Sequence, residues 1–279
     1  MPLKVGCIAY LNILPYFYYL KEAGFEGEVV SGVPSELNRM LSSGEIDACP
    51  SSSFEYGLNA KQYLLLPGFS ISSMGSVQSV LFFQHETHRS ARHKSIALTG
   101  ESATSINLLK VLLYELEFFA ADEVSFEIPQ GAVEDALLNG QDALLIGDRA
   151  LHIAKQKPKG VRIFDLGFLW YQLTGLPFVF ALWILRRQSV REDPEAFRKF
   201  KDTLSLSFRL AFDNLEVLAK SSVGQTICDQ SELVRYWQNI SYDLTDLHLK
   251  GLKLFFQLCK KYELLNDVPE FHFFDSSVV

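Results

Sequence analysis

Four short polar segments occur at predicted strand-to-helix junctions, and they hold residue types that could bind a ligand or act on it. They are Tyr10-Leu11-Asn12, Ser51-Ser52-Ser53, Ser102-Ala103-Thr104-Ser105 and Gly147-Asp148. Three of them place hydroxyls or an amide beside a predicted helix N-terminus, where free backbone N–H groups and the helix dipole favour an anion. Each polar residue could be a simple N-cap, but four junctions in one chain favour a cleft that holds a carboxylate with neutral donors.

Acidic residues that could act as general acids or bases lie near the same junctions. We expect Asp47 to pair with backbone groups, whereas Glu55 and Glu101 suit the first turns of helices as favourable charges. Asp148 is the acidic residue that could point into the cleft. These residue types alone leave the identity of a proton-transfer group open.

Sequence patterns for nucleotide, metal and activated-serine chemistry are absent. The chain has no GxxxxGK(S/T), GxGxxG, HExxH or GxSxG pattern, so we expect no cofactor. Three of the six histidines, His85, His88 and His93, fall in the basic stretch 85–94. A metal site there would have only Glu86 as an acidic partner at ligand spacing, so we expect a solvated crossing between two lobes and no metal.

The composition is that of an ordinary soluble globular protein. The 279 residues are 48% hydrophobic and 21% charged, which excludes disordered and coiled-coil classes, and the net charge of −7 disfavours a nucleic-acid binder. The longest apolar run, residues 178–185, is far shorter than the ~20 residues of a membrane span. Asn12 and Pro15 interrupt the apolar N-terminus and no signal-peptide cleavage site follows, so we expect a mature N-terminus and a cytoplasmic protein.

Apolar strands alternate with helices up to about residue 187, a pattern typical of parallel sheets covered by helices. The predicted strands span 5–10, 28–33, 46–50, 77–83, 95–99, 143–146 and 178–185, and later helices span 194–220, 231–239 and 245–263. The stretch 36–48 resembles 134–143, because each reads as a helix, a glycine stop and a strand opened by Asp-Ala. This internal repeat predicts two α/β lobes.

Seven segments between about residues 4 and 187 carry a family resemblance. They are Tyr10-Leu11-Asn12 with Leu14-Pro15, residues 32–38, Ser51-Ser52 with Glu55-Tyr56, residues 70–73 with Val77, Ser79 and Val80, Leu98-Thr99 with residues 101–105, residues 145–148, and residues 174–181. Together they resemble the chorismate dehydratase family of the futalosine route to menaquinone. The C-terminal third matches only in being helical.

The resemblance implies a type II periplasmic-binding-protein-like fold, with two α/β lobes around a central cleft. It implies a hydro-lyase that converts chorismate, a dicarboxylate, to 3-(1-carboxyvinyloxy)benzoate and water without a redox cofactor. By motif position, Asn12 and Ser79 would be the catalytic residues that grip the substrate. Further residues would bind it: Tyr10, Ser51, Ser52, Ala103, Thr104, Ser105, Gly147 and Asp148.

Related dihydroxynaphthoate synthases share the implied fold but keep a histidine base near the position of Gly147-Asp148 and an early Pro-Asn-Asp motif. This chain has neither, which argues against the sister activity. Met74-Gly75-Ser76 stands where many relatives are expected to carry Asp-Gly-Pro, a change that could alter the loop that carries Ser79.

Two choices of base and two classes of function follow from this reading. We expect the enolpyruvyl carboxylate of the substrate to take the C3 proton, positioned by Asn12 and Ser79, with Asp148 or Glu101 as the alternative base. The alternative function is a non-catalytic cytoplasmic module that binds a small carboxylate, because the same lobes host both classes.

We expect the first lobe to comprise residues 1–86 plus 188–279 and the second lobe residues 87–187. The C-terminal Phe271-His272-Phe273-Phe274 could support a homodimer, but we expect it to pack onto its own lobe. We expect no nucleic-acid partner and no membrane contact.

Overall fold

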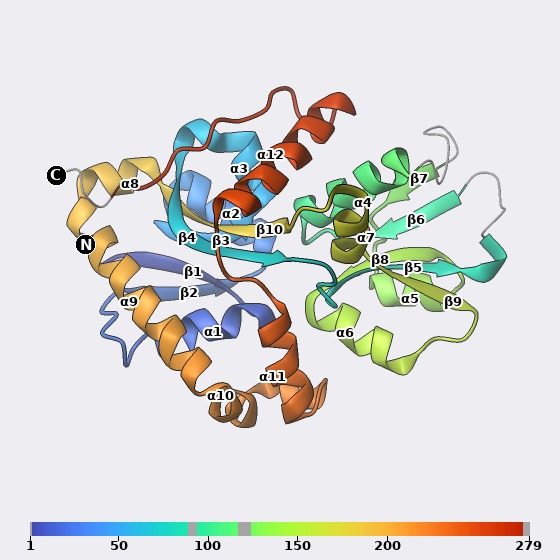
Figure 1. Ribbon diagram of the computed structural model, residues 1–279, viewed down its shortest axis with the longest axis horizontal. Helices are drawn as coiled ribbons and strands as arrows, with labels where there is room; N and C mark the ends of the chain where they lie inside the picture. Colours follow the sequence, from blue (N-terminus) through green and yellow to red (C-terminus); the bar gives the residue numbers. More distant parts are fainter. Residues whose placement is uncertain (1, 89–93, 117–123, 276–279) are drawn as a thin grey trace.

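Two five-stranded sheets, each covered by helices, form the two lobes of the protein (Figure 1). The computed structural model describes residues 2–88, 94–116 and 124–275. The central strands are largely buried because helices cover both faces of the sheets. The predicted α/β fold of two lobes is confirmed.

The first sheet has the strand order β2-β1-β3-β10-β4. Its strands are β1 (Lys4–Ile8), β2 (Glu28–Gly32), β3 (Ala48–Ser52), β4 (Tyr63–Ser73) and β10 (Phe178–Arg186). Strand β1 pairs in parallel with β2 and β3, whereas β10 lies antiparallel between β3 and β4.

The second sheet repeats this plan with the order β7-β6-β8-β5-β9. Its strands are β5 (Val80–His85), β6 (Lys94–Leu98), β7 (Val124–Glu127), β8 (Asp142–Ile146) and β9 (Val161–Asp165). Strand β6 pairs in parallel with β7 and β8, and β5 lies antiparallel between β8 and β9. Strand for strand, β1, β3 and β10 therefore correspond to β6, β8 and β5.

The internal repeat seen in the sequence is a helix followed by a strand, β3 in the first sheet and β8 in the second. Helix α2 (Pro34–Ser43) ends at Gly44, with φ 83°, before β3. Helix α5 (Val133–Leu138) is followed by Gly140, with φ 92°, before β8. Both glycines adopt the left-handed conformation that ends a helix at little steric cost. The predicted repeat is confirmed.

The pairing of two strands corrects the expected lobe boundaries. Strand β5 was expected in the first lobe and β10 in the second, but β5 pairs with β8 and β9, and β10 pairs with β3 and β4. The chain crosses between the lobes at residues 74–79 and at residues 175–177. After the first crossing it forms β5 in the second sheet, and after the second crossing it forms β10 in the first sheet. Ser73 pairs with Phe178, so the first crossing begins beside the end of the second. We propose lobe boundaries at these two crossings.

The basic stretch 85–94 does not cross between the lobes, contrary to expectation. It joins β5 to β6 within the second sheet through a short 3-10 helix, η3 (Glu86–His88), and residues 89–93, including His93, lie outside the described residues. The Nδ1 atom of His88 lies 3.0 Å from Oδ1 of Asp142, and Nε2 of His85 lies 3.0 Å from the Leu137 carbonyl oxygen. His88 therefore ties η3 to β8, and His85 contacts the end of α5.

Eight α-helices of the described ranges accompany the first sheet and four accompany the second (Figure 1). The first set comprises α1 (Leu14–Phe17), α2, α3 (Ser53–Asn59), α8 (Arg187–Glu192), α9 (Pro194–Asp213), α10 (Leu215–Ser221), α11 (Gln230–Asn239) and α12 (Asp246–Lys261). The second set comprises α4 (Ala103–Glu115), α5, α6 (Gly147–Gln156) and α7 (Leu166–Thr174). Across the described part of the chain, no helix combines the length and the apolar character needed to cross a membrane.

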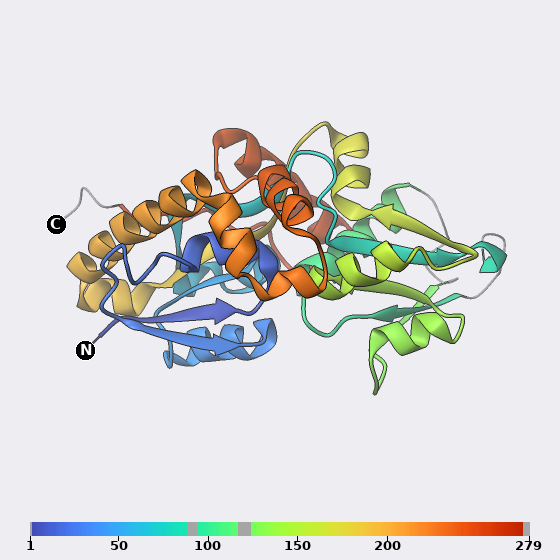
Figure 2. The ribbon, with the colours of Figure 1, turned by 90° about the horizontal axis from the view of Figure 1, so that it is seen from below.

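The C-terminal helices run along the first lobe, and α11 reaches the boundary with the second lobe (Figure 2). The final segment packs onto its own lobe, as predicted, because the Leu65 N–H donates to the His272 carbonyl oxygen at 2.7 Å. Phe274 returns the bond to Leu65 at 2.9 Å, and its side chain is buried. This segment covers the exposed edge of β4.

Candidate active site

A pocket lies between the lobes, where the carboxyl ends of strands from both sheets face each other. The lining residues come from both lobes: Ile8, Tyr10, Asn12, Ile13, Pro34, Ser52, Ile71, Val77, Ser79, Val80, Glu101, Ser102, Ser105, Ile146, Gly147, Phe180 and Ala181. The structure thus brings Asn12, Ser79 and four of the eight predicted substrate-binding residues to one pocket.

Asn12 lies on a short 3-10 helix, η1 (Leu11–Ile13), directly after β1. Its backbone carbonyl accepts a hydrogen bond from the Tyr242 hydroxyl at 2.9 Å, which holds the backbone of Asn12 in place. The side-chain Oδ1 is buried and has no partner among the described residues. A buried amide oxygen without a partner in a pocket can accept a hydrogen bond from a ligand, and the N–H of the same amide is the group that can donate to a carboxylate.

Ser79 ends the crossing from β4 to β5 and is almost fully buried. Gln78, the residue before it, has φ 66°, an uncommon value for a residue other than glycine. Asp165 holds this bend, since its carboxylate accepts from Val77 N–H at 3.1 Å and Gln78 N–H at 2.7 Å. It also accepts from the Ser76 hydroxyl at 2.5 Å while it caps α7 through the N–H of Phe168. One carboxylate therefore sets the backbone that presents Ser79.

Serine side chains at two helix N-termini complete the polar part of the pocket. Ser52 caps α3 by accepting from the Glu55 N–H at 3.2 Å. Ser102 caps α4 by accepting from the Ser105 N–H at 3.2 Å, and the two hydroxyls lie 3.0 Å apart. The expected N-cap role of these serines and their position in the pocket are both realised, because a cap at the end of a strand faces the cleft.

Tyr10 and Glu101 join the two lobes across the pocket. The Tyr10 hydroxyl donates to Glu101 Oε2 at 2.5 Å, and Arg149 lies 3.6 Å from the other carboxylate oxygen. Burial, reinforced by the Glu101 carboxylate, raises the pKa of Tyr10, so the phenol stays protonated and acts as the donor. The Tyr10 ring also covers Gly147, where an added Cβ would lie 3.2 Å from ring carbons.

Four predicted substrate-binding residues lie outside the pocket lining, and their assignment stays a prediction. Ser51 is buried on β3 and alternates with Ser52, so its side chain takes the other face of the strand. The side chain of Ala103 is exposed, and Thr104 Oγ1 accepts from the Phe54 N–H at 2.9 Å. Asp148 Oδ1 accepts from the Leu11 N–H at 3.1 Å, and burial raises the pKa of this carboxyl.

The pocket combines neutral donors with an apolar wall. Its apolar members include Ile8, Ile71, Val77 and Phe180. Among its described lining residues there is no lysine or arginine, and Glu101 is the one carboxylate. An anionic ligand here would therefore rest on hydroxyls, an amide and backbone N–H groups.

Two residues behind the pocket escaped the sequence analysis. Asp165 was detectable only as a possible helix cap before Leu166, whereas its contacts with residues 76–78 arise from the fold. Tyr236 lies on α11, and its hydroxyl donates to Ser79 Oγ at 2.9 Å. Its position in a helical stretch without motifs gave no signal.

The sequence pattern of a family described as menaquinone biosynthesis matches residues 3–261. The chain belongs to the menaquinone biosynthesis family. It is 35% identical to the chorismate dehydratase of Thermus thermophilus, over 91% of this chain and 94% of that protein. It is 29% identical to the chorismate dehydratase of Campylobacter jejuni, over 93% and 98%. The predicted family resemblance is confirmed.

Known structures support the fold of this menaquinone biosynthesis family member. A protein from Archaeoglobus fulgidus is similar with a TM-score of 0.72 and 20% identity, over 94% of this chain and 98% of that one. An alkanesulfonate-binding protein from Xanthomonas axonopodis pv. citri, bound to MOPS, gives 0.69 at 12% identity over 96% and 94%. A Candida albicans protein with the generic periplasmic-binding-protein fold also gives 0.69, at 11% identity over 96% and 92%.

Proposed function

We propose that the protein is a chorismate dehydratase, a hydro-lyase that converts chorismate to 3-(1-carboxyvinyloxy)benzoate and water in menaquinone biosynthesis. The observation that carries the proposal is the convergence of Asn12 and Ser79 on one pocket, in a chain of this family. The identity to two chorismate dehydratases supports the choice of substrate.

The chemistry of the substrate suits a pocket of neutral donors. The C3 proton of chorismate is allylic and vinylogous to the ring carboxylate, so negative charge spreads toward that carboxylate when the proton leaves. Donors fixed at the carboxylate stabilise this charge, and one such donor is worth ~3 kcal/mol. Ser52, Ser102 and Ser105 are the hydroxyls we place at this end. Aromatisation of the ring supplies the driving force.

The substrate itself is the base in this mechanism. Its enolpyruvyl carboxylate, held by Asn12 and Ser79, takes the C3 proton, and the electron pair of the C3–H bond passes into the ring. The C4–O bond then breaks on the same ring face, and the hydroxide takes the proton back from the carboxylic acid to leave as water. The two lobes exclude bulk water and hold the reacting groups in this geometry.

Glu101 is the protein carboxylate best placed to replace the substrate as base. It lines the pocket, whereas Asp148 is bonded to the Leu11 N–H outside the lining. The short bond from Tyr10 occupies one oxygen of Glu101. This occupied oxygen and the negative charge of the substrate favour the substrate's own carboxylate.

We place the reaction in the cytoplasm. The relatives that share sequence with this chain are enzymes of biosynthesis, whereas the ligand-binding proteins share only the fold. Separation of cell extracts into cytoplasmic and periplasmic fractions, followed by immunodetection, tests this location.

The test of function is incubation of the purified protein with chorismate, without metal or nucleotide, followed by liquid chromatography with mass detection. We expect an aromatic product lighter than chorismate by one water, formed in proportion to enzyme and formed about 10²-fold more slowly by the Ser79→Ala variant. Unchanged chorismate with a thermal shift would identify a non-catalytic binding module instead. Unchanged chorismate without a shift would reject this ligand.

A further inference from the structure

The hydroxyl of Tyr236 reaches Ser79 from behind the pocket. Tyr236 is 2% exposed and does not line the cavity, yet its O–H donates to Ser79 Oγ at 2.9 Å. Ser79 stands at the start of β5 in the second sheet, whereas α11, which carries Tyr236, packs with the first-lobe helix α10. This hydrogen bond therefore joins the two lobes at a residue of the proposed reaction.

The bond restricts where the proton of Ser79 can point. A serine hydroxyl has one proton and two lone pairs, and it rotates to suit its partners. Because Tyr236 donates to one lone pair, the Ser79 proton must point elsewhere. Its other protein partner, the Val77 carbonyl oxygen, lies at 3.4 Å, which is long for a bond between oxygens. A ligand oxygen in the pocket is the better acceptor.

Tyr236 remains a donor across the range in which enzymes are assayed. Burial raises the pKa of its phenol, and the bond to Ser79 offsets this only in part. Its direction of donation is thus constant with pH.

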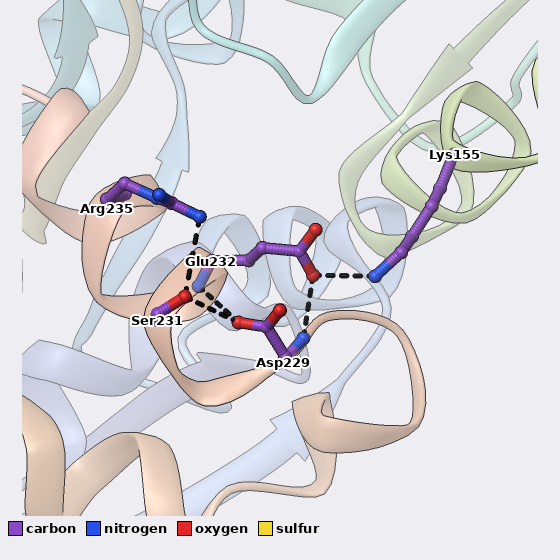
Figure 3. Close-up of polar contacts among 5 residues, drawn as sticks. All are labelled: Lys155, Asp229, Ser231, Glu232 and Arg235. Carbon is purple, nitrogen blue, oxygen red and sulfur yellow. Dashed lines mark hydrogen bonds and ion pairs between the residues drawn. The ribbon is translucent and has the colours of Figure 1, made fainter.

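The helix that carries Tyr236 is fixed at both ends. At its start, Asp229 and Glu232 form a capping box, and Lys155 of α6 in the second lobe donates to Glu232 at 2.6 Å (Figure 3). At its end, the Asn239 side-chain amide donates to the Ser76 carbonyl oxygen at 2.6 Å, in the same loop as Ser79. Tyr236 lies between these two anchors, so its hydroxyl is held in register with Ser79.

We propose that Tyr236 is a positioning residue that turns the Ser79 O–H toward the enolpyruvyl carboxylate of the bound substrate. This inference rests on the proposed dehydratase function and adds to it a residue from the C-terminal helices. Tyr236 itself does not touch the substrate and acts only through Ser79.

Steady-state kinetics of Tyr236→Phe test the proposal, because phenylalanine keeps the ring and removes only the hydroxyl. We expect kcat for chorismate to fall roughly tenfold, as for loss of one oriented hydrogen bond, while KM changes less than about threefold. Tyr56→Phe is the matched control. Tyr56 is equally buried, and its hydroxyl donates to the Glu270 carbonyl oxygen at 2.8 Å, away from the pocket. We expect its kinetics to match the wild type.

The same substitution in a Ser79→Ala background separates positioning from a structural effect. With Ser79 absent there is no hydroxyl to direct, so Tyr236→Phe should cause no further loss of kcat. Equal losses with and without Ser79, or wild-type kcat in Tyr236→Phe, would overturn the inference. Absence of turnover in the wild-type protein would instead overturn the proposed function.

Discussion

The junction after β1 and the junction after β6 occupy equivalent places in the two sheets, yet they present different chemistry to the pocket. After β1 stand Tyr10 and Asn12, whose amide oxygen has no partner in the described part of the chain. After β6 stand Glu101 and Ser102, which caps α4. The junctions meet in the Tyr10–Glu101 hydrogen bond. The two sheets thus share one strand order but place different groups at the pocket, an unbonded amide oxygen after β1 and a carboxylate after β6.

The next pair of equivalent junctions differs in the same sense. After β3, the hydroxyl of Ser52 caps α3, whereas after β8 the chain turns at Gly147 with φ 59° and no side-chain cap on α6. Gly147 leaves room for the Tyr10 ring from the first lobe. At this pair of junctions, the first lobe therefore contributes the Ser52 side chain, whereas the second contributes the backbone of Gly147 and the space that its missing side chain leaves.

The largest expected effect comes from Asn12→Ala. We expect kcat/KM for chorismate to fall about 10²- to 10³-fold, because the variant loses the amide N–H that we propose to hold the enolpyruvyl carboxylate. Ser102→Ala, at the equivalent junction, should lower kcat/KM less than about tenfold, because the hydroxyls of Ser52 and Ser105 remain at the same end of the pocket, and should reduce stability by about 1 kcal/mol through loss of a helix cap. Steady-state assays and urea unfolding measure both. Equal losses of activity would show that the two junctions are not specialised as we describe.

Asp165→Asn tests how the loop of Ser79 is held. The amide can replace only one carboxylate oxygen, so the bonds from Ser76 and Gln78 lose their acceptor, and we expect a loss of about 2–3 kcal/mol in the free energy of unfolding. We also expect a lower kcat, because Ser79 follows this bend. Asp193→Asn is the control, since Asp193 caps α9 and has no contact with the loop. Unaltered kcat in Asp165→Asn would contradict the role of the bend.

Gly147→Ala tests the space that the second lobe leaves for Tyr10. A left-handed φ costs alanine roughly 1–2 kcal/mol, and the new methyl would press on the Tyr10 ring. Gly140→Ala is the matched control, because Gly140 has φ 92° and open space around the added Cβ. Urea unfolding should show a larger loss for Gly147→Ala, with a fall in activity confined to that variant. Identical losses would mean that Tyr10 moves freely.

The smallest expected effect is that of Asp148→Asn. Burial raises the pKa of Asp148 above its ordinary value of 3.8, so the folded chain holds this proton more tightly than the unfolded chain. Its contribution to stability is full below pH 3.8 and is lost as pH rises through the raised pKa.

The asparagine oxygen can still accept from the Leu11 N–H and does not titrate. The stability of the variant relative to wild type should therefore increase between about pH 3.5 and 7, with kcat within about twofold. Thermal unfolding across this range measures the first, and steady-state assays the second. A relative stability that falls with pH would reverse the sign of the burial argument.

Local sequence signals predicted much of the fold and many of the residues at the cleft. Strand ends, caps and glycine stops are encoded by neighbouring residues, so the repeat and the positions of Asn12, Ser52 and Ser105 at the cleft were foreseeable. The sheet membership of β5 and β10 was not, because a strand that is apolar on both faces fits either sheet. Tyr236 and Asp165 act through contacts with distant segments, which no local pattern encodes.

The most direct test of the account is kcat/KM of the Glu101→Gln enzyme with chorismate. Glutamine keeps an oxygen that can accept from Tyr10 and removes the one carboxylate among the described lining residues. If the substrate's own carboxylate is the base, activity should stay within about tenfold of wild type while Asn12→Ala remains severely impaired. A loss of 10³-fold or more in a folded Glu101→Gln enzyme would make Glu101 the base and contradict the account.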